Sequence, residues 1–313
     1  MRLAITGASG FFGPHIVGEA LRREHEVLAV GRRSIPARLG VFEGKRFSYS
    51  AGVDVAAFDQ LLKAVEQFRP QVIIHAAAGG VSRSAPSSAY DALSSNVLAG
   101  AEVARTARHL ESAVIWIGSA FEYEPTDQLI SESQPTASTS AYGLAKNLAW
   151  QACMALSGAV PRLTLRPFQL YGPGEDAARF TMAALLAPLG RAANQFGDGS
   201  LVRDFVYATD AAEAVILGAE KLASDSSLSG EVVNVASGTG TSLAEMANIA
   251  AVAAGQPDFH FQFAGAPLGA GYNPKRLVGD GARIHRLLGW KPRTSIADGM
   301  RQTLEWALAS ATT

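Results

Sequence analysis

The sequence contains one cysteine, Cys153, in 313 residues. A disulfide within the chain is therefore impossible. Because no cluster of cysteine and histidine residues is present either, we expect no structural zinc site and no other metal centre. This cysteine content fits a reducing compartment.

Net charge and long apolar runs are also scarce. The formal net charge is −1, so no overall field attracts nucleic acid or an anionic membrane. No apolar run approaches the length of a membrane span, and the segment between Arg2 and the Thr6-Gly7 turn is too short for a signal-peptide core. We therefore expect a cytoplasmic protein that binds neither nucleic acid nor membrane.

The first half of the chain alternates short apolar runs with longer segments of helical periodicity. Hydrophobic residues make up 48% of the chain and charged residues 18%, as in a well-packed globular protein. The apolar runs are residues 3–6, 27–30, 47–49, 72–75 and 114–117, and helical patterns begin at residue 15 and cover 55–67 and 90–109. This alternation predicts an α/β fold with a doubly wound parallel sheet.

Prolines and glycines interrupt the pattern after residues 163–165. It partly recovers in a helical segment at 211–222 and a strand-like segment at 231–235, followed by expected helices near 242–254, 281–288 and 296–309. We predict a larger domain of residues 1–165, to which residues 205–235 return. The segments 166–204 and 236–313 are expected to form a smaller, discontinuous C-terminal lobe.

A glycine-rich turn follows the first predicted strand directly. Three glycines, Gly7, Gly10 and Gly13, stand between this strand and the first predicted helix. In this context the first glycine permits a tight turn, the second lets the backbone approach a pyrophosphate, and the third allows close packing of helix on strand. The context predicts a Rossmann-type dinucleotide site rather than an ordinary turn, with these cofactor contacts: Gly7, Ser9, Gly10, Phe11, Phe12 and Gly13.

Two arginines, Arg32 and Arg33, follow the second predicted strand, where the adenosine ribose is expected. An acidic residue there would accept hydrogen bonds from a free 2′-hydroxyl, whereas two guanidiniums can bind a 2′-phosphate. The pair favours NADP(H), and NAD(H) stays possible. The alternative interpretation is that both arginines are solvated loop charges.

Tyr142 and Lys146 are four residues apart in a predicted helix and so share one of its faces. A nearby ammonium favours the phenolate, which makes Tyr142 a candidate acid/base whose pKa is tuned by Lys146. The spacing alone is common, and it gains weight from the glycine turn. Ser119 ends the buried strand at 114–117 and could donate to a substrate oxygen, or act only as a turn or cap hydroxyl.

Together these residues resemble the extended short-chain dehydrogenase/reductase family, in its nucleotide-sugar epimerase, dehydratase and ketoreductase branch. The resemblance covers nearly the whole chain. Beyond the turn and the Tyr142/Lys146 pair, it rests on His75-Ala76-Ala77-Ala78, Asn96-Val97, Leu165-Arg166-Pro167-Phe168-Gln169-Leu170-Tyr171-Gly172-Pro173, Gly197-Asp198-Gly199, Arg203-Asp204-Phe205-Val206-Tyr207 and Leu288-Gly289-Trp290-Lys291-Pro292.

The resemblance implies that Ser119, Tyr142 and Lys146 form the catalytic set and that Arg203 holds a nucleotide-sugar diphosphate. Lys275-Arg276 is a weaker candidate for the same diphosphate. It also implies a homodimer through the helices that carry Asn96 and Tyr142. Further cofactor contacts implied are Asp54, Val55, Ala76, Ala77, Ala78, Asn96, Tyr142, Lys146, Pro167 and Phe168. Candidate substrate contacts are Val81, Ser119, Ala120, Phe121, Gln169, Phe196, Arg203 and Arg276. Phe196 could stack on a nucleobase or anchor its loop.

Departures from the family pattern narrow the reaction. Dehydratases of this family typically place Asp and Glu after the catalytic hydroxyl, where this chain has Ala120 and Phe121. Glu122 follows, but in an extended segment its side chain would point away from that of its neighbour. We therefore do not expect dehydration. Gln169 stands where an Asn is usual, which leaves the sugar contacts open.

Two enzymatic reactions remain. One is reduction of a keto group on a nucleotide-activated sugar, often a 6-deoxy sugar, and the other is epimerisation with retained cofactor. The Arg32-Arg33 pair favours the reductase, because NADPH is the usual cellular reductant. A non-catalytic dinucleotide-binding regulator is a third possibility, but it has no need for Ser119, Tyr142 and Lys146 together.

Overall fold

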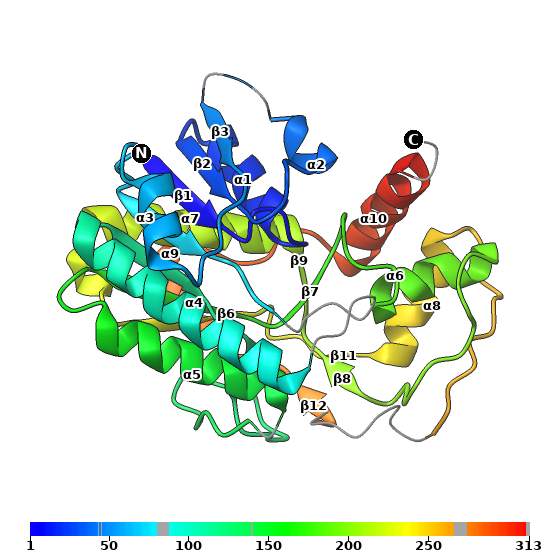
Figure 1. The fold of residues 1–313 in the computed structure, drawn as a ribbon. Helices are drawn as coiled ribbons and strands as arrows, with labels where there is room; N and C mark the ends of the chain where they lie inside the picture. Colours follow the sequence, from blue (N-terminus) through cyan, green and yellow to red (C-terminus); the bar gives the residue numbers. More distant parts are fainter. Residues whose placement is uncertain (43, 45, 80–87, 139, 266–273, 311–313) are drawn as a thin grey trace.

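A seven-stranded parallel sheet forms the centre of the larger part of the molecule (Figure 1). The computed structural model describes residues 1–42, 44, 46–79, 88–138, 140–265 and 274–310. The strand order is β10-β6-β5-β4-β1-β2-β3. The strands are β1 (Arg2–Thr6), β2 (Glu26–Val30), β3 (Phe47–Ser50), β4 (Val72–His75), β5 (Ala113–Ile117), β6 (Arg162–Pro167) and β10 (Val232–Val235).

Helices cover both faces of this sheet, because its strands are apolar on both sides. Leu3 and Ile5 of β1 pack into a core with α1 (Gly13–Arg22), α7 (Ala208–Ser224) and α9 (Ala282–Leu288). Ala4, between them, faces the core formed with α3 (Phe58–Val65), α4 (Ala89–Leu110) and α5 (Ala141–Leu156). The predicted doubly wound α/β fold is confirmed. A short helix, α2 (Ala37–Gly40), precedes β3.

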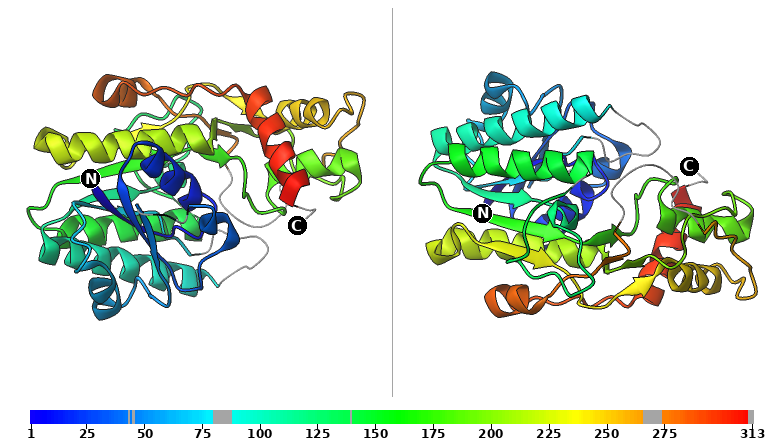
Figure 2. Two further views of the ribbon diagram at one scale, coloured as in Figure 1. Left: turned by 90° about the horizontal axis from the view of Figure 1, so that it is seen from above. Right: turned by 90° about the horizontal axis from the view of Figure 1, so that it is seen from below.

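A smaller lobe lies beside the sheet (Figures 1 and 2). Its core joins α6 (Phe180–Leu186), α8 (Leu243–Ala253) and α10 (Ile296–Ser310). A three-stranded sheet of order β11-β8-β12 lies next to them, made of β11 (Thr241–Ser242), β8 (Val202–Arg203) and β12 (Arg276–Leu277). Short 3-10 helices are η1 (Ala120–Glu122), η2 (Ala187–Leu189) and η3 (Ser226–Leu228).

The chain passes between sheet and lobe on adjacent strands. β7 (Gln169–Tyr171) pairs in parallel with β9 (Phe205–Tyr207). The division into a domain of 1–165 with 205–235 and a lobe of 166–204 with 236–313 stays a proposal. Within that last segment, α9 packs against α7 and β10 rather than with α8 and α10.

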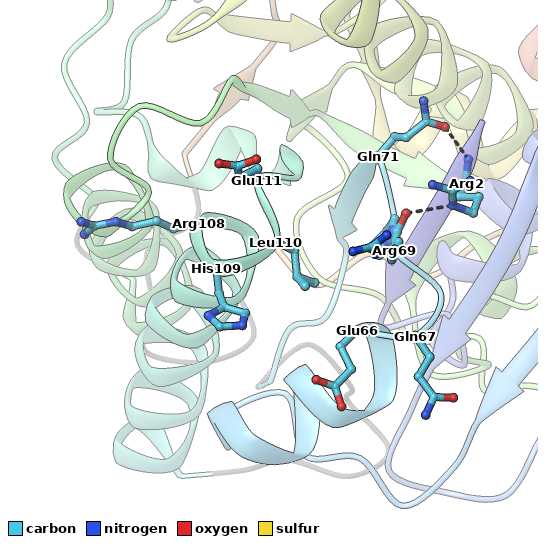
Figure 3. Close-up of a pocket in the computed structure, with 10 residues that line it drawn as sticks. Arg2, Glu66, Gln67, Arg69, Gln71, Arg108, His109, Leu110 and Glu111 are labelled. Atoms are coloured by element: carbon cyan, nitrogen blue, oxygen red, sulfur yellow. Dashed lines mark hydrogen bonds between the residues drawn. The ribbon is translucent and has the colours of Figure 1, made fainter.

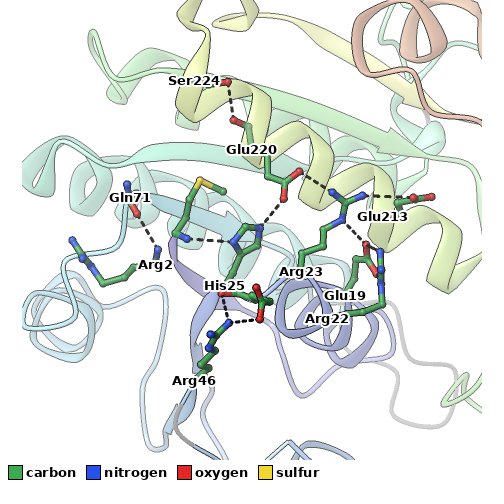
Figure 4. A network of polar contacts seen from close by, with 12 residues as sticks. Arg2, Glu19, Arg22, Arg23, His25, Arg46, Gln71, Glu213, Glu220 and Ser224 are labelled. Carbon is green, nitrogen blue, oxygen red and sulfur yellow. Dashed lines mark hydrogen bonds and ion pairs between the residues drawn. The ribbon is translucent and has the colours of Figure 1, made fainter.

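An ion-pair network joins α7 to the end of α1 and the turn that follows it (Figure 4). Arg23, just after α1, bonds Glu19 at 2.7 Å and Glu220 of α7 at 2.9 Å. His25 Nε2 lies 2.9 Å from the same Glu220 carboxylate. Segments nearly 200 residues apart in sequence are thus held side by side.

A search of the helices that the structure describes finds no membrane-spanning candidate.

Asp204 lies where three passages of the chain between sheet and lobe meet. Its side chain is fully buried, and Oδ1 accepts from the backbone N of Ser237 at 2.9 Å and from the Ser237 hydroxyl. Oδ2 accepts from the backbone N of Gly238 at 3.0 Å and of Gly279 at 3.2 Å. One carboxylate therefore fixes the segments around residues 204, 237 and 279 to one another.

Replacing Asp204 with alanine removes these acceptors, leaves the buried N–H of Gly279 without its partner and releases the part-buried donors of Ser237 and Gly238. We expect the free energy of unfolding to fall by about 3 kcal/mol or more. Urea unfolding followed by circular dichroism measures the change. Asp127→Ala, at an exposed aspartate, is the matched control and should change stability by no more than about 0.5 kcal/mol. Equal stability of the two variants would contradict the assignment.

Candidate active site

The predicted site residues gather at the carboxyl ends of the central strands, the edge where ligands bind in open α/β sheets. The glycine turn follows β1, Ala76 follows β4, and Ser119 follows β5. Strand pairing sets these ends beside one another, since Thr6 pairs with His75 and His75 with Trp116. The arrangement brings the predicted cofactor and catalytic segments to one edge.

The glycine turn is packed too closely for side chains at two of its positions. Gly7 has φ +72°, and a Cβ there would lie 2.4 Å from the backbone N of Ala77. A Cβ on Gly13 would lie 2.4 Å from the Gly7 carbonyl oxygen, to which the N of Gly10 donates at 3.0 Å. α1 begins with no side-chain cap, so its first N–H groups remain available to an anion.

The two phenylalanines of this turn flank the helix start. The Phe12 carbonyl accepts from the backbone N of His15 and of Ile16, which starts the helix. The ring of Phe11 meets the His15 ring edge-on, with centroids 5.8 Å apart. Ser9 contributes its carbonyl, which accepts from Arg38 at 2.9 Å.

Arg32 and Arg33 are exposed immediately after β2. The Tyr49 hydroxyl donates to the Arg33 carbonyl at 2.9 Å and fills the space beside Gly31, which pins the backbone at this point. Asp54 is exposed, and its carboxylate accepts from the N of Ala56 at 3.1 Å, closing its own turn. Val55 packs into the core.

Asn96 holds the backbone just beyond Ala76, Ala77 and Ala78. Its Oδ1 accepts from the N of Gly79 at 3.1 Å, and its Nδ2 donates to the Gly79 carbonyl at 3.2 Å. In this structure Asn96 therefore positions the loop in which the three alanines lie. Val81, predicted to contact substrate, lies outside the described residues.

Ser119 and Tyr142 lie close to each other, near enough for the Ser119 hydroxyl to affect the pKa of the Tyr142 phenol. Ser119 Oγ also accepts from the N of Phe121 at 3.2 Å. The close approach depends on Gly143, where a Cβ would lie 2.1 Å from the Phe121 carbonyl oxygen. This role of Gly143 was not predicted, although the glycine directly after the candidate tyrosine could have indicated a close approach of the backbone there.

Burial raises the pKa of the Tyr142 phenol, while the Ser119 hydroxyl and the Arg179 guanidinium oppose that rise. Arg179 was not among the predicted site residues. It precedes α6 in the smaller lobe, and Glu175 holds it at 2.9 Å. The lobe thus brings a cation toward the catalytic end of α5.

Lys146 is buried beneath the same edge. Its ammonium donates to the Ile117 carbonyl at 2.9 Å and lies 5.8 Å from the Trp116 ring centroid. Burial lowers the pKa of Lys146 to about 8. His75 stacks on the Trp116 ring, with centroids 4.7 Å apart, and its Nδ1 lies 2.8 Å from the Thr6 hydroxyl oxygen. Burial, with a contribution from Lys146, lowers the pKa of His75 to about 3, so this ring is neutral.

Glu122 is fully buried behind Ser119. Its Oε1 accepts from the backbone N of Ser119 at 2.7 Å, and its Oε2 pairs with Arg166 at 2.9 Å. Residues 120–122 form a 3-10 helix, so the expectation of an extended segment was wrong. The ion pair and the bond to the Ser119 N–H orient this carboxylate. Neither Ala120 nor Phe121 supplies an acid at this edge.

The predicted substrate contacts are spread over the junction with the lobe. Pro167 ends β6, Phe168 is buried with its ring against Gly279, and Gln169 begins β7. Phe196 is only 7% exposed, and its ring packs against Phe180, Phe261 and Phe263. Phe196 therefore anchors its loop, and we do not propose it as a nucleobase contact.

Arg203 and Arg276 do not converge. Both belong to the small sheet, where Arg203 pairs with Leu277 and Arg276 pairs with Val202. Because paired residues share a face and successive residues alternate, the two arginines lie on opposite faces. Arg203 is buried, and Arg276 is half-buried near Gly240. The expectation that they grip one diphosphate is therefore not supported.

A surface hollow lies at the opposite, amino-terminal edge of the sheet (Figure 3). Arg2 starts β1 there, and its Nε donates to the Arg69 carbonyl at 2.9 Å. The hollow is lined by Arg2, Glu66, Gln67, Arg69, Pro70, Gln71, Arg108, His109, Leu110 and Glu111. It includes none of the predicted site residues. Across the described part of the chain, no three His, Cys, Asp or Glu side chains gather as metal ligands.

A glycine turn entering a helix, with a serine, a tyrosine and a lysine at the same sheet edge, defines the class of an extended short-chain dehydrogenase/reductase. The sequence model of the NAD dependent epimerase/dehydratase family matches residues 3–236, and the chain belongs to this family. The predicted resemblance is confirmed. The chain is thus an enzyme of the extended short-chain dehydrogenase/reductase type.

Relatives span nearly the whole length of the chain. The UDP-glucose 4-epimerase of Mycolicibacterium smegmatis is 29% identical over 98% of both chains. A dTDP-glucose 4,6-dehydratase of Neisseria gonorrhoeae is 23% identical over 99% of this chain and 96% of its own. The structure of MoeE5 in complex with UDP-glucose and NAD matches with a TM-score of 0.85 and 25% identity, covering 99% of this chain and 100% of MoeE5.

Replacing Glu122 with alanine leaves Arg166 buried without its partner and the N–H of Ser119 without its acceptor. We expect a loss of about 3–5 kcal/mol in the free energy of unfolding, measured with urea. Glu305→Ala serves as the control, because Glu305 pairs with Arg301 at 3.9 Å on the surface. That variant should stay within about 0.5 kcal/mol of the original chain. A fully stable Glu122→Ala protein would refute the structural role.

Proposed function

We propose that the chain transfers hydride between a nicotinamide dinucleotide and a ring carbon of a nucleotide sugar. The favoured direction is NADPH-dependent reduction of a keto group on a nucleotide-activated sugar, often a 6-deoxy sugar. The observation that carries this proposal is the approach of the Ser119 hydroxyl to the Tyr142 phenol at the same sheet edge as the glycine turn. NADP(H), when bound, supplies the hydride.

The residues divide the remaining work. Tyr142 donates its proton to the carbonyl oxygen as that oxygen gains negative charge, and Ser119 hydrogen-bonds the same oxygen. Burial keeps the phenol of Tyr142 protonated before the reaction, which suits a proton donor. In this proposal the buried Lys146 and, from the lobe, the half-buried Arg179 stabilise the phenolate that the transfer leaves behind. The Arg179 guanidinium already opposes the rise in the pKa of Tyr142.

The preference for reduction rests on two features of the chain. Arg32 and Arg33 are exposed at the end of β2, where they can bind a ribose 2′-phosphate. Beside Ser119, the side chains of Ala120 and Phe121 carry no acid, and Glu122 is occupied by Arg166. The second feature disfavours water elimination, which needs an acid and a base next to the reacting carbons.

Epimerisation with retained cofactor is the second candidate. It uses the same three residues in both directions, and the 29% identity to the M. smegmatis UDP-glucose 4-epimerase over nearly the whole chain favours it. The NAD bound in the MoeE5 structure likewise supports NAD as an alternative cofactor. We propose Arg203 as the diphosphate ligand, in line with the family resemblance.

A homodimer is proposed through α4 and α5, which lie side by side on one face of the sheet (Figure 2). Leu144 and Leu148, one turn apart on α5, are exposed, as are Tyr90 and Leu98 on α4. Apolar side chains of this size on neighbouring helices favour a contact with a second copy.

The function is tested by incubating the protein with NADPH and a panel of 4-keto-6-deoxy nucleotide sugars, and separately with UDP-glucose. We expect loss of absorbance at the nicotinamide band with stoichiometric formation of a sugar alcohol. Tyr142→Phe should lower turnover by about 10²- to 10⁴-fold and keep cofactor affinity. Tyr207→Phe, which removes only a hydrogen bond to Gln302 in the lobe, is the control and should keep nearly full activity. Inversion of a sugar stereocentre without net NADPH oxidation would replace the reductase with the epimerase.

The pH dependence of turnover follows from Lys146. Its pKa is lowered to about 8, so its ammonium loses its proton as the pH rises through that value. We expect kcat/KM, which reports the groups of the free enzyme, to be constant well below pH 8 and to fall above it, because the cation proposed to stabilise the phenolate disappears. Lys146→Arg should move this alkaline limb upward, since a guanidinium stays charged. An identical limb in that variant would show that another group titrates.

A further inference from the structure

Arg38, in the short helix α2, reaches from one side of the glycine turn to the loop after β7. Its Nη2 donates to the Ser9 carbonyl at 2.9 Å, and its Nη1 donates to the Gly174 carbonyl at 3.1 Å. The side chain is half-buried. The guanidinium therefore has a defined position at the turn where the dinucleotide phosphates are expected.

The guanidinium of Arg38 lies where it does because Gly174 has no side chain. Gly174 has φ +84°, and a Cβ there would lie 2.6 Å from Arg38 Nη1, so any larger residue would displace the guanidinium. His15, in the first turn of α1, fixes the same loop, with Nε2 2.8 Å from the Pro173 carbonyl oxygen. The loop and the glycine turn thus enclose Arg38 between them.

The charge of Arg38 is not balanced by any carboxylate in the described part of the chain, since both of its bonds go to carbonyls. Burial, with no opposing acid, lowers its pKa, and its charge in turn contributes to the lowered pKa of His15. A guanidinium has five N–H donors, so further donors remain for an anion.

We propose that Arg38 binds a phosphate group of the dinucleotide cofactor, in addition to the exposed pair Arg32-Arg33. The inference rests on the proposed use of a dinucleotide, but not on the sugar or the direction of the reaction. Both the pyrophosphate and a ribose 2′-phosphate carry the chemistry that a guanidinium recognises. An oxidised and a reduced cofactor bind through the same groups.

The test compares the dissociation constants of NADPH and NADH by calorimetry at fixed salt for the original chain, Arg38→Gln and Arg38→Lys. We expect Arg38→Gln to weaken binding about tenfold or more, as for the loss of a charge-assisted hydrogen bond. Arg38→Lys keeps the charge but not the forked donors, so its dissociation constants should lie between those of the original chain and those of Arg38→Gln. The matched control is Arg46→Gln. Arg46 is exposed and donates to the Glu24 carbonyl at the amino-terminal end of β2, the end opposite the glycine turn.

The pattern of losses identifies the phosphate. Equal weakening of NADPH and NADH assigns the pyrophosphate, and weakening of NADPH alone assigns the 2′-phosphate. If both constants stay within twofold of the original in Arg38→Gln and Arg38→Lys, Arg38 only fastens the loop and the proposal fails. Thermal unfolding checks that each variant is folded, and if Arg38→Gln is not, Arg38→Lys decides. Binding without turnover on any sugar would overturn the proposed function and leave Arg38 assigned.

Discussion

The buried pair of Glu122 and Arg166 is the constraint on which the catalytic edge depends. One carboxylate oxygen holds the backbone of Ser119, and the other holds a guanidinium whose plane rests on the rings of Tyr123 and Trp150, at 4.7 and 5.3 Å. The pair joins the end of β5 to β6. Two charges taken out of water this completely require each other, so the loop that carries Ser119 has one well-defined conformation.

The same constraint shapes the electrostatics of the site. The Glu122 carboxylate opposes the effect of burial on Lys146, whose ammonium rests on the Ile117 carbonyl. His75, stacked on the Trp116 ring, stays neutral, so it adds no second buried cation. Tyr142 is the one acid/base candidate of the site that faces both Ser119 and a cation from the lobe. The charged pair of Glu122 and Arg166, which holds the loop of Ser119 in place, is therefore separate from the hydroxyl groups of Ser119 and Tyr142 that are proposed to act on the substrate.

Periodicity and the glycine turn predict most of the larger fold. The expected strand at 72–75 is β4, and the expected helices at 242–254 and 296–309 correspond closely to α8 and α10. These elements follow local patterns of apolar residues, which a sequence displays directly. The juxtaposition of Ser119 and Tyr142 was predictable for a related reason. Ser119 follows the end of a strand and Tyr142 stands at the start of a helix, and in a parallel sheet strand ends and helix starts meet at the same edge.

Other parts of the site depend on contacts that no local pattern encodes. Glu122 meets Arg166 across 44 residues, and Arg38 meets Gly174 across 136. The faces of Arg203 and Arg276 depend on the register of two-residue strands, which their composition does not set. Phe196 was ambiguous for the same reason, since its ring partners Phe261 and Phe263 lie far along the chain.

Asp204 also ties the end of β6 to the segment around residue 279. Three segments of the chain meet at this one carboxylate, and β7 runs paired with β9 beside it. A shift of any one of these segments therefore breaks hydrogen bonds that position the other two. The ring of Phe168, the residue after Pro167, packs on Gly279, so the carboxylate that holds Gly279 also sets the surface against which this ring rests.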